Sequence, residues 1–404
     1  MSHYRHALIA SIGSGLEYFS FATFAFQAPY LSLVFFPADP RLQGMLHTFL
    51  IFAVGYFVTV LGGMFFGYVG DRLGRKNLLM LSIFLMSASC LGIGVLPTGI
   101  AYVSLTLLIF FRVLQGLAQG AELPGAIIFV TEHAHDKNRG LLCGLLMMGV
   151  GLGAGIATSI NVALNSLLSF QQMLIWGWRV PFLAAVCLGG IGFLLRFHAS
   201  ETPVFTAMPK MRIKLTWKPL LHGVLLVWLI AVLVSLGLYW PSLLTTVYHF
   251  PSHFVFLAMM LAFIVSAFLV PIFGYMGDRY GRGRMYMVGI ILNLIALPFL
   301  FLLLHFNHLF TLILFAIIYY VLIVVLAGLY PVMLTELSPP QNRYFSVALS
   351  YTGCYAIASV TPAFASFLFA HHGGMPALIG FIEVSGVLSL LAGWWYYRKI
   401  GGFN

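Results

Sequence analysis

Long apolar runs that contain almost no charge are the feature that most limits how this chain can fold. Of its 404 residues, 20 are Lys or Arg and 10 are Asp or Glu, so 7% are charged, whereas 61% are hydrophobic. A soluble domain carries about 25% charged and about 45–50% apolar residues, and a disordered chain needs low hydrophobicity and high charge. The sequence therefore predicts a polytopic membrane protein, because each spanning helix needs about 20 mostly apolar residues.

The apolar runs form two groups of six, separated by one long polar segment. We expect an all-α integral membrane fold of twelve transmembrane helices in two similar bundles. Residues 1–198 are expected to form the N-terminal six-helix bundle, residues 199–217 a cytoplasmic linker, and residues 218–404 the C-terminal six-helix bundle. The first run is too long for a cleavable signal peptide. The expected spans are residues 7–35, 45–69, 77–97, 101–132, 139–167, 179–198, 218–247, 252–277, 285–305, 308–335, 343–370 and 375–397.

The basic residues predict the orientation of the chain. With the N-terminus in the cytoplasm, every Lys and Arg falls on the cytoplasmic side except Arg41 and Arg179, which lie opposite, and Arg112, which lies inside a span. Loops rich in Lys and Arg stay in the cytoplasm, so both termini are predicted to be cytoplasmic. This pattern accounts for the net charge of +10, and we expect no nucleic-acid partner.

Signatures of catalysis and metal binding are missing from the sequence. It contains no H-E-x-x-H, no Walker loop and no C-x-x-C, so we expect neither an enzyme nor an ATP-driven pump, and no cofactor. His371 and His372 are assigned to an outer loop and not to a metal site. The four cysteines lie in apolar runs and are expected to pack as small apolar residues. These cysteines are Cys90, Cys143, Cys187 and Cys354.

A motif rich in glycine and charge occurs at equivalent places in the two halves. Residues 67–76 read GYVGDRLGRK, and residues 274–284 read GYMGDRYGRGR. The aspartate of each motif ends its helix, where the helix dipole disfavours an anion, so it needs cationic partners. We predict a charge latch that holds the halves together; the alternative is a tight turn with a positive cluster. The latch residues are Asp71, Arg72, Arg75, Asp278, Arg279 and Arg282.

The fourth span carries a stripe of polar residues. Arg112, Gln115, Gln119 and Glu122 lie at offsets that keep them on one face of a helix turning by about 100° per residue. Lipid offers such a face no hydrogen-bond partners. We predict that the stripe lines the transport path; a structural polar seam between helices is the alternative.

Two carboxylates lie at similar depth in the membrane. Glu17 and Glu122 are each about ten residues, or about 15 Å, from the cytoplasmic end of their spans. If their helices face each other, at least one carboxylate would hold a proton. We predict that this pair couples transport to protons; the alternative is that each carboxylate is paired with a neighbouring donor. Glu383, in the last span, is assigned to packing.

Aromatic residues of the second half are candidates for binding a substrate cation through their π faces. Tyr239, Trp240, Tyr351 and Tyr355 are predicted to bind substrate together with Arg112, Gln115 and Gln119. Packing or membrane-interface roles are the alternative for these aromatics. The same ambiguity applies to Tyr248, Tyr319, Tyr320 and Tyr330.

Further motifs follow one another along nearly the whole chain. They are RVLQG at 112–116, GAE at 120–122, Glu132 with RG at 139–140, WGWRVPF at 176–182, ETP at 201–203, EL at 336–337 and RY at 343–344. In this order they resemble the metabolite:proton symporter family of the major facilitator superfamily, which includes proline/betaine, shikimate, α-ketoglutarate and citrate transporters. The resemblance implies a bacterial inner-membrane protein that binds a small substrate and protons. It also adds Glu132, Glu336 and Arg343 to the expected gating residues.

The chain departs from the family pattern at several positions. Ser20 replaces an acidic residue of the first span, Thr59 an arginine of the second and Thr352 an asparagine of the eleventh. The sequence ends at Asn404 without the cytoplasmic coiled-coil tail of some proline/betaine transporters, so tail-based osmosensing is not expected.

The function expected is import of a small metabolite by proton symport with alternating access, as a monomer in the lipid bilayer. One arginine within the spans fits one carboxylate, which favours a zwitterion such as an amino acid or a betaine over a mono- or dicarboxylate. The alternatives are an uncoupled facilitator or an exporter of an organic acid or other small metabolite, and a receptor that uses the transporter fold.

Overall fold

The computed structural model describes residues 2–37, 41–98, 101–198, 200–207, 217–306, 308–371 and 374–400. Twelve helical stretches in these ranges are long and apolar enough to cross a membrane, which confirms the predicted all-α fold. The helices are α1 (Ser2–Phe35), α2 (Arg41–Leu73), α3 (Arg75–Gly94), α4 (Ala101–His133), α5 (Arg139–Leu167), α6 (Phe170–Ile175), α7 (Val180–Phe197), α8 (Pro203–Ala207), α9 (Trp217–Thr246), α10 (Ser252–Tyr280), α11 (Arg282–Leu300), α12 (Leu309–Ala327), α13 (Tyr330–Leu337), α14 (Arg343–Ala358), α15 (Thr361–His371) and α16 (Met375–Lys399).

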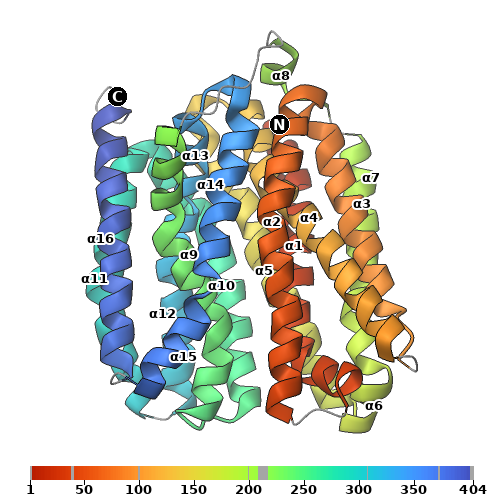
Figure 1. The fold of residues 1–404 in the computed structure, drawn as a ribbon. Helices are drawn as coiled ribbons and strands as arrows, with labels where there is room; N and C mark the ends of the chain where they lie inside the picture. The colour runs from red at the N-terminus through yellow and green to blue at the C-terminus, as the bar shows by residue number, and fades with distance from the viewer. Residues whose placement is uncertain are drawn as a thin grey trace.

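The two halves of the chain lie side by side. Figure 1 shows α1 to α7 on one side and α9 to α16 on the other, with both termini and α8 at the same end of the molecule. We call this end the terminal face. Six spans precede α8 and six follow it.

Two apolar runs expected to form single helices are each broken in the structure. The run after residue 308 divides into α12 and α13, and the run after residue 343 divides into α14 and α15. At the first break, a Cβ on Gly328 would lie 2.8 Å from the backbone nitrogen of Gly274 and 2.9 Å from the carbonyl oxygen of Val270. Glycine therefore lets the chain pass against α10, and Pro331 lies in the first turn of the following helix, which begins at Tyr330.

The halves meet along two helix pairs, α5 with α10 and α2 with α14. The first pair is closest where Gly140 faces Gly274, because a Cβ on either residue would collide with the carbonyl oxygen of the other. Small residues at a crossing let helix backbones approach in a membrane. The interface therefore brings both charged motifs to the terminal face.

The cysteines and histidines form no metal site in the part of the chain that the structure describes. Cys90, Cys143 and Cys354 are buried and unpaired, as expected of small apolar residues, whereas Cys187 is exposed on the surface of α7. His371 is the last residue of α15, and His372 lies outside the described residues.

Candidate functional site

Arg112 on α4 is buried, with 1% of its surface exposed, and has no carboxylate partner among the described residues. Its Nη1 donates a 2.6 Å hydrogen bond to Gln115 Oε1, whereas Nε and Nη2 have no partner in the described ranges. The rings of Phe24 and Phe52 lie 4.6 and 4.8 Å from the guanidinium carbon, and Phe21 lies 5.8 Å away. A buried cation without a counter-ion is costly, and an anion beside it would offset that cost.

Ser20 does not supply the missing anion beside Arg112. Its hydroxyl donates a 2.7 Å hydrogen bond to the carbonyl oxygen of Leu16, one turn earlier on α1. Gln115 is held on its other side, because Nε2 donates to Cys90 Sγ at 3.6 Å. The neighbours of the Arg112 guanidinium are therefore Gln115 and aromatic rings, and none of them carries a negative charge.

Glu17 and Glu122 do lie near each other, on α1 and α4, but their surroundings differ. Glu122 accepts hydrogen bonds from Ser82 and from Arg196, with 2.8 Å between Arg196 Nη1 and Glu122 Oε2. Glu17 is 5% exposed, lies beside Gln119, and its Oε2 has no hydrogen-bond partner in the described ranges. Glu122 is thus neutralised by an ion pair, whereas the Glu17 carboxylate is not.

Arg196 corrects the expected count of charges within the membrane. It was assigned to the cytoplasmic side, but the last turn of α7 carries it into the bundle, where 2% of its surface is exposed. Its guanidinium packs against Gly13 of α1, where any larger residue would displace it. Its place inside an apolar run, between Leu195 and Phe197, was the available signal.

The candidate aromatic residues separate into two groups. Trp240 is 2% exposed and packs against Phe315 and Tyr319, as part of the aromatic packing within the second half. The rings of Tyr351 and Tyr355 on α14 pack against each other at a tilt of 42°, with 4.6 Å between their centroids. Tyr351 and Tyr355 are half-buried, whereas Trp240 is fully buried.

Two of the remaining aromatic candidates connect helices of the second half. Tyr319 and Tyr320 donate hydrogen bonds to α9 carbonyl oxygens, which ties α12 to α9. Tyr239 is half-buried near the C-terminal end of α9, and Tyr248 follows that helix. Glu383 is half-buried on α16.

The first charged motif forms a buried cluster at the terminal face. Asp71 pairs with Arg75 at 3.0 Å, and its two oxygens accept hydrogen bonds from the backbone nitrogens of Tyr344 and Phe345, at 3.2 and 3.0 Å. These nitrogens are the free donors at the start of α14, where the helix dipole favours an anion. The aspartate of the first half therefore caps a helix of the second half. Glu132 joins the cluster through Arg75, at 3.5 Å, and also pairs with Arg343, at 3.2 Å.

The second motif repeats this arrangement in the opposite direction. Asp278 accepts hydrogen bonds from the backbone nitrogens of Gly140 and Leu141, both at 2.9 Å, at the start of α5. Arg282 pairs with Asp278 at 2.8 Å and also binds Glu336. Each half thus places one carboxylate on a helix N-terminus of the other half.

Two predicted latch residues lie outside these clusters. Arg72 and Arg279 are exposed, and each lies over a neighbouring ring, Tyr68 at 4.1 Å and Tyr280 at 5.7 Å. The one-turn spacing from the aspartate suits Arg75 and Arg282 instead, because residues four apart share a helix face.

Several residues of the latch were missed. Glu201 of the linker accepts hydrogen bonds from the backbone nitrogens of Arg75 and Lys76, and Thr202 donates to Glu132 at 2.7 Å. The E-T-P motif was the signal for this contact, but only the fold brings it to the start of α3. Tyr396 binds Glu336 in the second half; nothing in the sequence marked it.

We expect Asp71→Asn to favour opening at the terminal face by about 1–2 kcal/mol, or roughly 5- to 30-fold, because the helix cap and the ion pair both lose the charge. Substrate affinity should change less than about tenfold. Distances between spin labels on α2 and α14 measure the opening. Asp136→Asn is the control, because Asp136 pairs with Arg139 at the surface of one half. A loss of substrate binding with no change in opening would contradict the assignment.

Tyr344→Phe should also favour opening, by about 1 kcal/mol. The Tyr344 hydroxyl donates a 2.7 Å hydrogen bond to the Ala121 carbonyl oxygen across the two halves. Tyr286→Phe is a matched control, since the Tyr286 hydroxyl is equally buried but binds Leu226 within the second half. The same spin-label distances should move in the first variant and stay unchanged in the second; equal shifts in both would point to general loosening.

The comparisons with known proteins agree with this architecture. Residues 6–216 match the family described as Sugar (and other) transporter, and residues 229–401 match the Major Facilitator Superfamily. The chain belongs to the major facilitator superfamily. It is 31% identical to the proline/betaine transporter of Salmonella typhimurium, over 95% of this chain and 81% of the relative. It is 28% identical to the shikimate transporter of Escherichia coli, over 93% and 90%.

The fold is also that of solved transporters. The proton:xylose symporter XylE, bound to 6-bromo-6-deoxy-D-glucose, superposes with a TM-score of 0.80 at 14% identity, over 99% of this chain and 96% of XylE. The family resemblance expected from the motifs is therefore confirmed. The protein is a multi-pass transporter of the inner membrane, and it is not an enzyme.

Proposed function

We propose that this transporter imports a small zwitterion, an amino acid or a betaine-like solute, by proton symport. The observation that carries the proposal is Arg112, a buried guanidinium with two unpartnered donor nitrogens and no carboxylate beside it in the described part of the chain. A guanidinium binds a carboxylate through two parallel hydrogen bonds. The name of the proline/betaine relative supports this choice.

The balance of charges favours a substrate with one carboxylate. The other two buried arginines, Arg75 and Arg196, are already neutralised by Asp71 and Glu122, so one free cation remains among the described buried groups. A di- or tricarboxylate would bring uncompensated charge into a low-dielectric site. The ammonium group of a zwitterion can lie against the faces of Tyr351 and Tyr355, which attract cations.

Glu17 carries the proton in this proposal. Its unpartnered oxygen and its burial make the charged form costly, so the carboxyl takes up a proton when no cation neutralises it. Glu122, which was expected to share this role, instead holds Arg196 in place. Gln119 lies beside Glu17 and orients it.

Alternating access is proposed as movement of residues 1–198 against residues 218–404, with 199–217 as the linker. The latch clusters close the terminal face, which we place in the cytoplasm with both termini because the basic residues gather there. The unit that moves is proposed to be a monomer.

Uptake by proteoliposomes tests the proposal. With an inward proton gradient, we expect accumulation of proline or betaine, and little of citrate or α-ketoglutarate. Accumulation of the carboxylates without the zwitterions would overturn the substrate choice. Equal uptake with and without the gradient would favour the uncoupled facilitator, for which Ser20, in place of an acid, is the supporting feature.

A further inference from the structure

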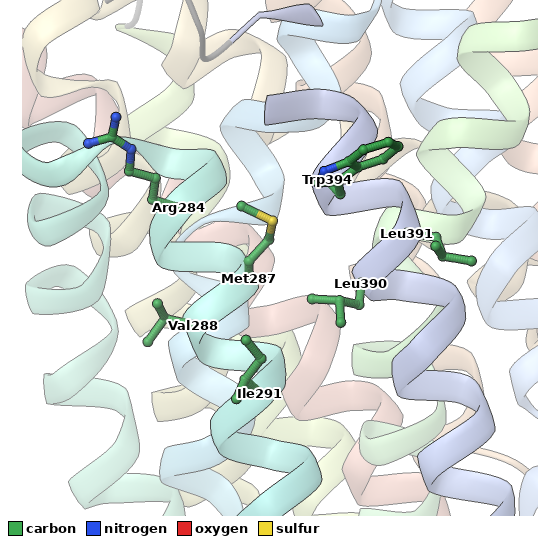
Figure 2. Close-up of a pocket in the computed structure, with 7 residues that line it drawn as sticks. All are labelled: Arg284, Met287, Val288, Ile291, Leu390, Leu391 and Trp394. Carbon is green, nitrogen blue, oxygen red and sulfur yellow. The ribbon is translucent and has the colours of Figure 1, made fainter. Parts of the chain in front are cut away.

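An open groove lies on the outer surface of the second half, between α11 and α16. It encloses about 740 Å³ and is lined by Arg284, Val288, Ile291, Leu390, Leu391 and Trp394. Figure 2 shows the α11 residues along one wall and the α16 residues along the other, with Arg284 and Trp394 at the same end. That end is the terminal face, because α11 begins there and α16 ends there. The groove lies on the outside of the bundle, away from Arg112.

Two arginines without a carboxylate partner among the described residues lie near this end: Arg284 lines the groove, and Arg398 lies against Trp394, which lines it. Arg284 donates hydrogen bonds from Nη2 and Nε to the hydroxyl of Tyr397, at 3.2 and 3.3 Å. Arg398 lies over the ring of Trp394, with 4.0 Å to the centroid. Both guanidinium groups therefore keep donors for an anion at the ends of α11 and α16 on the terminal face.

The charged end of the groove belongs to the second half alone. When the two copies of the repeated motif are aligned, with Gly67 matched to Gly274, the position equivalent to Arg284 in the first half is Asn77. The nearest lysine of the first half, Lys76, is used differently, because its Nζ donates a 2.9 Å hydrogen bond to the carbonyl oxygen of Phe197. The repeated fold therefore does not require an arginine here.

We propose that the groove binds an anionic phospholipid of the leaflet on the terminal side. One acyl chain lies between Ile291 and Leu390, and the phosphate accepts hydrogen bonds from Arg284 and Arg398. The apolar walls match a hydrocarbon chain, and the two arginines at one end match a phosphate headgroup. The lipid spans two helices that carry the second latch cluster, since Arg282 begins α11 and Tyr396 of α16 binds Glu336.

Lipid retention by the purified full-length protein tests the proposal. Detergent-solubilised protein is titrated with phosphatidylglycerol or phosphatidylcholine, and bound lipid is counted by native mass spectrometry. We expect tighter binding of phosphatidylglycerol, weakened about fivefold for each arginine removed in Arg284→Gln and Arg398→Gln. Arg279→Gln is the control, because Arg279 is equally exposed at this face but lies on α10. Equal binding of both lipids, or no loss in the double variant, would overturn the proposal.

A second pair of variants tests the apolar part without changing charge. Val288→Trp should fill the groove and lower phosphatidylglycerol retention about tenfold. Ile272→Trp should leave it unchanged, because Ile272 is exposed to a similar extent on α10, outside the groove. If Val288→Trp instead dissociates a dimer while lipid retention stays unchanged, the groove is an interface between two copies and the lipid proposal is wrong.

Discussion

Arg112→Ala is expected to abolish uptake, with a loss of substrate affinity of at least about 100-fold, or about 2.7 kcal/mol. Truncating one partner of a buried, hydrogen-bonded charge pair costs about 2–5 kcal/mol, and here the partner would be the substrate carboxylate. Arg112→Lys should recover only part of the loss, because lysine cannot form two parallel hydrogen bonds. Substrate binding by calorimetry and uptake by proteoliposomes measure both variants.

The stability of the empty protein separates a binding role from a structural one. Arg112 neutralises no carboxylate, so its removal leaves no buried anion without a partner. The melting temperature of the empty protein should therefore stay the same or rise. Arg196→Ala is the comparison: it leaves Glu122 buried without its cation, so the melting temperature should fall. Near-normal uptake by Arg112→Ala, or a loss of stability equal to that of Arg196→Ala, would reject the assignment.

Glu17→Gln should abolish accumulation driven by a proton gradient while exchange of substrate across the membrane continues within about threefold. Glutamine keeps the size and polarity of the side chain but cannot take up or release the proton. Accumulation under an imposed pH gradient and counterflow without one measure the two properties separately. The expected outcome is a transporter that equilibrates its substrate but no longer concentrates it.

Glu383→Gln is the control for this prediction. Glu383 is also a membrane carboxylate, but it is half-buried on α16, an outer helix. Its variant should accumulate substrate as the unaltered protein does. Accumulation by Glu17→Gln at the normal level would exclude Glu17 as the proton carrier; loss of both accumulation and counterflow would show instead that Glu17 is needed for binding.

Much of the architecture follows from local patterns in the chain. The length of each apolar run predicted the twelve spans. The spacing of Arg112, Gln115 and Glu122 predicted that they share a face of α4, because helical geometry depends only on neighbouring residues. The two copies of the glycine and charge motif predicted a latch, and their aspartates do join the halves.

Which charges find partners was decided by the tertiary structure. Glu17 and Glu122 are the same residue type at a similar expected depth in the membrane, yet the last turn of α7 brings the guanidinium of Arg196 into hydrogen bonds with Glu122 alone. Asp71 was expected to need only the arginines beside it, but it also caps α14, which begins more than 250 residues later. The break at Gly328 likewise depends on how closely α10 passes. Pairing between distant segments depends on where helices cross, and the crossings arise from the packing of whole helices rather than from any local run of residues.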